Sequence, residues 1–252
     1  MHRSIELFRP YLTEQDRSEL PWFYPIDSPA LYLKNLKEQA KDWPWRDRSI
    51  EYSLNSQGYR SPEFDQIDWS NSIVCFGCSM TFGIGLALDQ TWPAQLEQLL
   101  GYPCVNLGIP GGSIQAIWAN SVRLIRAGVR PRAVLYYWPE LSRSCEFMDD
   151  RRTLINWGTW KQQVPRTDQR GARGTAWLMD PVYAGVMSRL MIDSIEWGGV
   201  PRLDWTWTQE LSDRAHYWLD VRDRARDLRH PGPATNSSLA RELARALGNL
   251  DN

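Results

Sequence analysis

The sequence predicts an α/β fold in which a parallel β-sheet is covered by helices on both faces. Three short apolar runs indicate buried strands: Ile73–Gly77, Cys104–Gly108 and Ala133–Trp138. Amphipathic helical patterns separate these runs, over Gln90–Gly101 and Ser113–Gly128. Strands and helices that alternate in this way form βαβ units. Because ligands of such sheets bind at the carboxyl ends of the strands, the segments that follow the three strands should share one rim.

The N-terminal part of the chain has a different character. Residues 1–70 are interrupted by Pro21, Pro25, Pro29 and Pro44, and one helix is predicted over Ala30–Lys41. We expect residues 1–70 to form an N-terminal extension that packs on the main domain, and residues 71–252 to form the α/β domain.

The C-terminal half of this domain departs from the alternating pattern. Residues 145–215 are expected to form a Trp-rich insertion over the rim, with one helix near Tyr183–Ile195. Regular structure returns in an amphipathic helix over Ser237–Gly248, for which Asn236 is a suitable N-cap and Gly248 a stop.

Composition limits the classes of partner. The 252 residues include 30 acidic and 29 basic side chains, for a net charge of −1. Such a balance gives no long-range attraction to nucleic acid or to an anionic membrane. No stretch of 18 consecutive apolar residues and no secretory signal are evident, so we expect no membrane association and a cytoplasmic location. The sequence does not determine the oligomeric state.

The four cysteines do not indicate a disulfide scaffold in a chain of this length. Cys75 and Cys78 form a CxxC pair, but zinc sites normally need a second pair of ligands. The whole chain has only three histidines. We therefore expect no metal site, and we expect both cysteines to pack as small apolar residues.

Two predicted rim segments contain groups that could act on an ester. In FGCSMTFGIG (Phe76–Gly85), Ser79 lies at a tight turn after the first strand. A helix that starts after this turn would aim backbone N–H groups at an anion near Ser79. In NLGIPGGS (Asn106–Ser113), Gly111 and Gly112 can present N–H groups for an oxyanion hole. Taken singly, the first segment also fits a serine helix cap and the second a flexible loop.

A third segment, ARDLRHPGPATN, contains a carboxylate and an imidazole. Asp227 and His230 stand three residues apart, beside a Pro-Gly-Pro loop. A neighbouring carboxylate can orient an imidazole and stabilise it once it is protonated. The alternative is a salt-laced surface loop, since five charged residues surround the pair.

Together the three segments resemble the SGNH/GDSL hydrolase superfamily. Its pattern is Gly-Asp-Ser near the first strand, a Gly-containing loop after the second, Gly-x-Asn-Asp after the third, and Asp-x-x-His near the C-terminus. FGCSMTFG, NLGIPGGS and DLRHPG are similar to the first, second and last blocks. YSLNSQGYRSPEF (Tyr52–Phe64) is similar to the lead-in of some bacterial and phage members. The resemblance covers residues 52–140 and 216–252.

This resemblance implies a three-layer α/β/α sandwich of the flavodoxin-like type, with about five parallel strands. It implies Ser79 as nucleophile, His230 as general base and Asp227 as the carboxylate that orients it. The backbone N–H groups of Ser79 and Gly111 would form the oxyanion hole. It implies no metal or cofactor.

The chain departs from the family pattern at two positions. Cys78 replaces the Asp that precedes the nucleophile, but that Asp is not a member of the triad. AVLYYWPELSR (Ala133–Arg143) lacks the Asn that serves as a side-chain oxyanion donor, whose loss costs about 10²–10³ in rate. Trp138 and Arg143 are the candidates to replace it.

The leading interpretation is therefore an ester hydrolase that forms an acyl intermediate on Ser79, with an acetylated sugar as a candidate substrate. Two alternatives stay open: a binding or structural protein on an inactive scaffold, and an acyltransferase with the same triad. Asp213 and His216 form a second Asp-x-x-His, but we expect His230 to be the base because its loop can reach the rim.

Tryptophan is unusually frequent, and half of the 14 lie between residues 157 and 218. We expect this stretch to form a substrate-facing wall that suits a flat or sugar-like substrate. Trp205, Trp207, Trp138 and Arg143 are the candidate substrate-binding residues, and Trp157 and Trp160 also lie in short runs that are hard to bury. The alternative is that the rings fill a satellite core.

Overall fold

A computed structural model describes residues 5–158 and 180–248. Its centre is a parallel five-stranded sheet with the strand order β3-β2-β4-β7-β8. The strands are β2 (Ile73–Gly77), β3 (Cys104–Gly108), β4 (Ala133–Trp138), β7 (Arg202–Thr206) and β8 (His216–Tyr217). The first three have the bounds that the sequence predicted.

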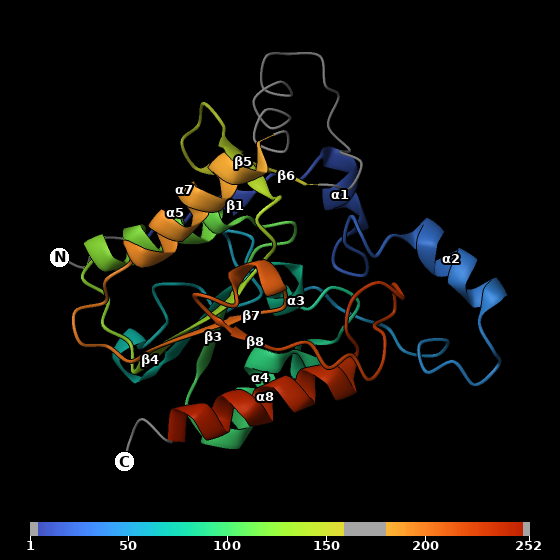
Figure 1. The fold of residues 1–252 in the computed structure, drawn as a ribbon. Coiled ribbons are helices and arrows are strands. Elements are labelled where there is room, and N and C mark those ends of the chain that lie inside the picture. The colour runs from blue at the N-terminus through green and yellow to red at the C-terminus, as the bar shows by residue number, and fades with distance from the viewer. Residues whose placement is uncertain (1–4, 159–179, 249–252) are drawn as a thin grey trace.

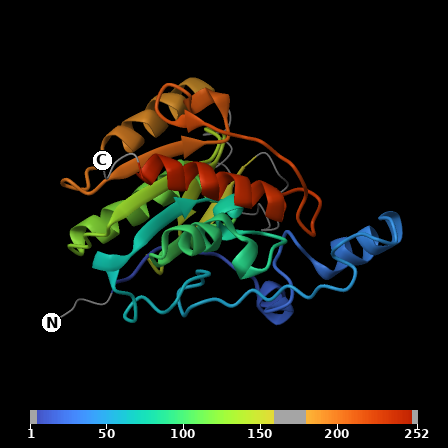
Figure 2. The same ribbon diagram turned by 90° about the horizontal axis from the view of Figure 1, so that it is seen from below.

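Helices cover both faces of this sheet (Figure 1). One face carries α5 (Ile114–Arg126) and α7 (Pro181–Asp193), and the other carries α4 (Trp92–Leu100) and α8 (Pro233–Gly248). Figure 2, turned by 90°, shows α8 lying across the sheet. The predicted three-layer α/β/α sandwich is confirmed.

The side-chain period of a strand explains the two cores. Val74 and Phe76 of β2 enter the core beneath α5 and α7, whereas Ile73 and Cys75 enter the core beneath α4 and α8. Every residue of β2 is buried, as expected for a parallel strand covered on both sides. The rigid centre therefore holds the carboxyl end of β2 in a fixed position.

Two sequence expectations for the C-terminal half are wrong. Strand β7 lies inside residues 145–215, which were expected to form an insertion, and it is the fourth strand of the main sheet. Helix α8 begins at Pro233, so Asn236 lies inside the helix and is not its N-cap. The Asn236 side chain instead accepts the Trp92 N–H at 3.0 Å, which ties α8 to the start of α4.

The N-terminal residues pack against the sandwich through a second, small sheet. Its order is β1-β6-β5, from β1 (Arg9–Pro10), β6 (Thr153–Trp157) and β5 (Ser144–Phe147). Helix α1 (Glu14–Glu19) follows β1, and α2 (Pro29–Glu38) extends away from the sheet (Figure 1). A short α3 (Ser79–Phe82) and three 3₁₀ turns complete the described elements: Trp69–Asn71, Leu88–Gln90 and Gln209–Leu211.

Within residues 5–158 and 180–248, no helix has the length and apolarity to cross a membrane. The same part of the chain contains no group of three or more His, Cys, Asp and Glu side chains arranged to hold a metal ion. Cys75 and Cys78 are free and buried.

Candidate active site

Ser79 lies at the sharp connection between β2 and α3. Gly77 ends the strand, Cys78 is the N-cap residue, and Ser79 is the first residue of the helix. Cys78 has no exposed surface, whereas Ser79 lines a pocket of about 760 Å³. The hydroxyl therefore reaches the pocket and the neighbouring thiol does not.

The connection is tight because α3 lies directly on β3. A Cβ at Gly108 would stand 2.2 Å from the backbone nitrogen of Phe82, so only glycine fits there. Asn106 of β3 donates from Nδ2 to the Thr81 carbonyl at 2.8 Å. Its Oδ1 accepts the Gly108 N–H at 3.0 Å. Asn106 thus fixes α3 and does not face the pocket.

The far end of α3 is held by a buried cation. Arg60 donates to the carbonyls of Phe82, Gly83 and Leu86 at 3.3, 2.9 and 3.0 Å. A four-residue helix leaves its last carbonyls without intrahelical donors, and Arg60 supplies them. Burial lowers the pKa of Arg60 to about 10, so the side chain remains charged at neutral pH. This gives the Tyr52–Phe64 run a structural role behind Ser79.

Asp227 and His230 lie on the loop before α8 and face Ser79. His230 Nε2 is 2.8 Å from Ser79 Oγ, and His230 Nδ1 is 2.5 Å from Asp227 Oδ2. This is the order of groups in a nucleophile–base–carboxylate chain. The same carboxylate accepts the backbone N–H groups of Arg229 and His230, both at 3.1 Å. The loop closes tightly through Leu228, whose φ of 59° is left-handed.

The carboxylate of Asp227 is held in its charged form. Its burial opposes ionisation, but hydrogen bonds from the His230 ring and from two backbone N–H groups prevail and lower the pKa below its ordinary value. A charged Asp227 keeps the proton of a neutral imidazole on Nδ1, which leaves Nε2 as the acceptor toward Ser79.

The second Asp-x-x-His pair does not approach Ser79. His216 packs its ring against Trp205, with centroids 4.4 Å apart. Asp213 pairs with Arg189 at 3.0 Å. The structure therefore brings His230, and not His216, to the serine.

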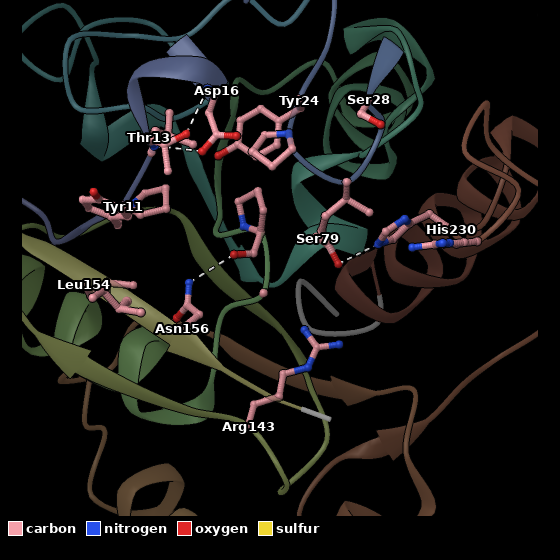
Figure 3. A pocket seen from close by; sticks show the side chains of 18 of the residues that line it. Tyr11, Thr13, Asp16, Tyr24, Ser28, Ser79, Arg143, Leu154, Asn156 and His230 are labelled. Carbon is pink, nitrogen blue, oxygen red and sulfur yellow. Dashed lines mark hydrogen bonds between the residues drawn. The ribbon is translucent and has the colours of Figure 1, made fainter. Parts of the chain in front are cut away.

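The pocket around Ser79 has a volume of about 760 Å³ (Figure 3). Four parts of the chain form its wall: the N-terminal segment, the rim of the main sheet, the β5–β6 hairpin and the loop before α8. The lining residues are Pro10–Thr13, Asp16, Tyr24–Ile26, Ser28, Leu31, Ser79, Pro110, Gly111, Arg143, Leu154–Asn156, Arg229 and His230. This volume is in the range of small-molecule sites and far exceeds one acetyl group.

Gly111 lines this pocket in a left-handed conformation, with φ of 69°. Within the described residues, neither the Gly111 N–H nor the Ser79 N–H has a hydrogen-bond acceptor. Two such donors beside the serine hydroxyl are what an oxyanion hole requires.

We predict that Gly111→Val lowers the turnover of an ester by about 10²-fold or more, because a β-branched residue cannot adopt this φ without moving the N–H. The comparison is Asn106→Ala, which loses the hydrogen bond between β3 and α3. This variant should lower the melting temperature more than Gly111→Val does. Turnover and thermal unfolding of both variants test the prediction. Parental turnover in Gly111→Val would remove Gly111 from the site.

Arg143 is one of two arginines that line the pocket, the other being Arg229. Its guanidinium is directed toward Ser79 in Figure 3, although only 8% of the residue is exposed. Glu140 holds its Nε at 2.8 Å, and the Trp207 ring lies 5.4 Å from the guanidinium carbon. Anchored in this way, Arg143 places positive charge on the wall of the pocket that faces Ser79.

The tryptophans predicted to bind substrate lie in the cores, which corrects that expectation. Trp138 has no exposed surface and donates to Asp204 at 2.7 Å. Trp205 is buried in the core beneath α4 and α8, and Trp207 packs against it and under Arg143. Of the other described members of the Trp-rich stretch, Trp157 and Trp197 are buried, and Trp218 is half-buried against the core beneath α4 and α8. None of these lines the pocket. Trp160 and Trp177 lie outside the described residues.

Sequence reasoning missed the wall that the N-terminal segment supplies. Tyr11, Asp16 and Tyr24 face the pocket, and so does Asn156 from β6 (Figure 3). No periodicity or motif in the first 30 residues marks these side chains. Their role follows from the pairing of β1 with β6, which joins residues about 144 positions apart.

The same segment holds the loop that carries Asp227. Arg226 and Asp27 form a buried ion pair at 2.7 Å, and Tyr52 donates to Asp27 at 2.6 Å. Asn35 of α2 donates to the Arg226 carbonyl at 3.1 Å. The residue immediately before Asp227 is therefore fixed to the N-terminal segment by both its side chain and its backbone.

We predict that Asp27→Ala destabilises the protein by about 3–5 kcal/mol, because it leaves the Arg226 charge buried without its partner. The matched control is Glu38→Ala, which removes an exposed pair with Lys34 at 3.9 Å and should cost under about 1 kcal/mol. Urea unfolding of both variants gives the comparison. Equal stabilities would show that the buried pair does not hold the loop.

No family model and no curated protein matches the chain. Three solved structures that match are a lipolytic protein of the G-D-S-L family, an acetyl xylan esterase and a carbohydrate esterase.

The G-D-S-L protein, from Desulfitobacterium hafniense DCB-2, is 14% identical at a TM-score of 0.35, over 70% of this chain and 99% of its own. The acetyl xylan esterase, from Butyrivibrio proteoclasticus, is 12% identical with a TM-score of 0.40, over 71% of this chain and 64% of its own. The carbohydrate esterase family 2 enzyme, from Corynascus thermopiles (Myceliophthora fergusii), is 14% identical with a TM-score of 0.42, over 80% of this chain and 70% of its own. These proteins are of the GDSL and carbohydrate esterase kinds that the sequence motifs resemble.

Proposed function

We propose that this protein is a serine ester hydrolase that works through an acyl intermediate on Ser79. The observation that carries the proposal is the continuous hydrogen-bonded chain from Ser79 through His230 to Asp227, which opens into a pocket. A serine hydroxyl is a weak nucleophile unless a base stands within hydrogen-bond distance, and His230 does so.

In the first step, Ser79 Oγ attacks the carbonyl carbon of the ester while His230 Nε2 takes the hydroxyl proton. The negative charge that develops on the carbonyl oxygen is stabilised by the N–H groups of Ser79 and Gly111. Collapse of this intermediate breaks the bond to the alcohol oxygen, which leaves with the proton from His230. The products are a free alcohol and acyl-Ser79.

In the second step, water attacks the acyl group while His230 takes its proton. Collapse breaks the bond to Ser79 Oγ, which recovers the proton from His230, and the carboxylic acid leaves. Asp227 stabilises the imidazolium in both steps and keeps the ring oriented. No step requires a metal or a cofactor.

Arg143 compensates for the absent family Asn in this proposal. A guanidinium that faces Ser79 and is anchored by Glu140 gives a preorganised positive charge near the developing oxyanion. Charge-assisted hydrogen bonds are about twice as strong as neutral ones. The lost donor therefore does not leave the oxyanion with backbone groups alone.

The test combines labelling and turnover. A fluorophosphonate probe should modify the wild-type protein at Ser79, located by peptide mass spectrometry, and 4-nitrophenyl acetate should be hydrolysed with an acyl-enzyme burst. Product analysis with added alcohols separates hydrolysis from acyl transfer. A folded protein that is neither labelled nor active would indicate the inactive scaffold instead.

A further inference from the structure

An unpaired hydroxyl group lies on the N-terminal wall of the pocket. Tyr24 is 2% exposed, and its ring packs on Phe82 and Tyr52 with centroids 4.8 and 5.6 Å apart. Within the described residues, its hydroxyl is buried and has no hydrogen-bond partner. Such a group costs about 1–3 kcal/mol, a cost that a ligand hydroxyl can remove.

A carboxylate accompanies this hydroxyl. Asp16 lines the same wall and lies beside Tyr24 in Figure 3. The Thr13 N–H donates to Asp16 Oδ2 at 2.8 Å, within the capping box of α1, which fixes the carboxylate in place. Burial, and then the charge of Asp16, raise the pKa of Tyr24 above its ordinary value, so the hydroxyl keeps its proton. A fixed acceptor and an unused donor thus stand side by side.

We propose that Tyr24 and Asp16 form a subsite for hydroxyl groups of the substrate's alcohol part, so that the substrate is an ester of a polyhydroxylated compound such as a sugar. The inference rests on the ester hydrolase function proposed above. A sugar hydroxyl donates to Asp16 and accepts from Tyr24, which satisfies both groups at once. Tyr11, 41% exposed on the same wall, offers an aromatic face for the ring.

Other substrate classes fit this wall less well. An apolar acyl chain would leave the Tyr24 hydroxyl buried and unpaired. A cationic alcohol part would pair with Asp16 but would give Tyr24 no acceptor, and an anionic one would be repelled by Asp16. The volume of about 760 Å³ leaves room for a sugar ring beside a short acyl group at Ser79.

The experiment compares an O-acetylated monosaccharide with 4-nitrophenyl acetate in the wild type and in Tyr24→Phe. We expect the ratio of the two kcat/KM values, sugar over aryl ester, to fall about 10- to 100-fold. The melting temperature should not fall, because the deleted hydroxyl has no bond in the free protein. Asp16→Asn, which can still accept the Thr13 N–H, should lower the same ratio. The control is Tyr102→Phe. Tyr102 packs against the Arg132 side chain and does not line the pocket, so this variant should leave the ratio unchanged.

Several results would overturn the subsite. These are an unchanged ratio in Tyr24→Phe, equal losses on both esters, or a preference for acetylcholine that survives in Tyr24→Phe. A wild type that hydrolyses the aryl ester but no sugar acetate would also overturn it, with the proposed function intact. A wild type that neither hydrolyses the aryl ester nor reacts with a fluorophosphonate would overturn the proposed function, and this inference with it.

Discussion

Ser79→Ala should lower kcat on 4-nitrophenyl acetate by about 10⁴- to 10⁶-fold, because the attacking oxygen is removed and His230 has no proton to take. The fold should be unaffected, since Ser79 is the first residue of α3 and its side chain faces the pocket. Fluorophosphonate labelling should disappear along with turnover. Steady-state kinetics and mass spectrometry on the purified variant measure both effects.

The control is the neighbouring Cys78→Ala. Its sulfur has no exposed surface, so this variant should lose stability, by about 1 kcal/mol, and should retain most of its activity. Adjacent residues at the turn thus separate nucleophilic chemistry from packing. Inactivation by alkylation of Cys78, with Ser79→Ala still active, would contradict the assignment.

The sequence predicts the central strands well because of how parallel sheets are built. A strand covered on both faces is apolar along its length, and β2 and β4 are entirely buried. Strand β7 does not follow this rule, because its first three residues are only half-buried. Arg202 and Asp204 form an ion pair at 2.7 Å on its half-buried first residues, so Arg202–Thr206 does not appear as an apolar run. Its pairing with β4 is a tertiary effect.

The candidate triad could be predicted for a related reason. Ser79 follows directly from β2, and the Asp227–His230 spacing is local, so short segments carry most of the information. The walls of the pocket could not be predicted in this way. Indole rings are equally suited to stacking on a ligand and to filling a core, and the burial of Trp138 and Trp205 depends on which helices cover them.

The sequence predicts that the N-terminal segment packs on the main domain, but not that it lines the pocket. It forms one wall of the pocket through Asp16 and Tyr24, and it fixes the loop before Asp227 through the Asp27–Arg226 pair. The pocket wall and the triad geometry therefore depend on the same segment. A variant that loosens this segment should affect specificity and kcat together.

Asp227→Asn should lower kcat by about 10³- to 10⁴-fold at neutral pH. An amide cannot stabilise the imidazolium as a carboxylate does, and when its NH₂ group faces Nδ1 it favours the tautomer that carries its proton on Nε2. The Ser79 hydroxyl would then face a donor instead of a base. Turnover of 4-nitrophenyl acetate and the rate of fluorophosphonate labelling should fall in parallel, because both need an activated serine.

The pH dependence of the unfolding free energy tests the charge of the Asp227 carboxylate independently of turnover. The pKa of Asp227 in the folded protein lies below the ordinary value of about 3.9. Its charge therefore stabilises the fold at pH values above about 3.9. This contribution is lost as the pH falls through the folded pKa. The difference in unfolding free energy between wild type and Asp227→Asn should therefore be largest near neutral pH and should shrink below about pH 4.

Asp223→Asn is the matched control for this variant. Asp223 lies on the same loop but accepts the N–H groups of Ala234 and Thr235, at 2.9 and 3.0 Å, at the start of α8. Its loss should lower stability while kcat stays near that of the wild type. If Asp227→Asn instead kept more than about a tenth of the wild-type kcat, the carboxylate would not orient His230, and the serine would need another source of activation.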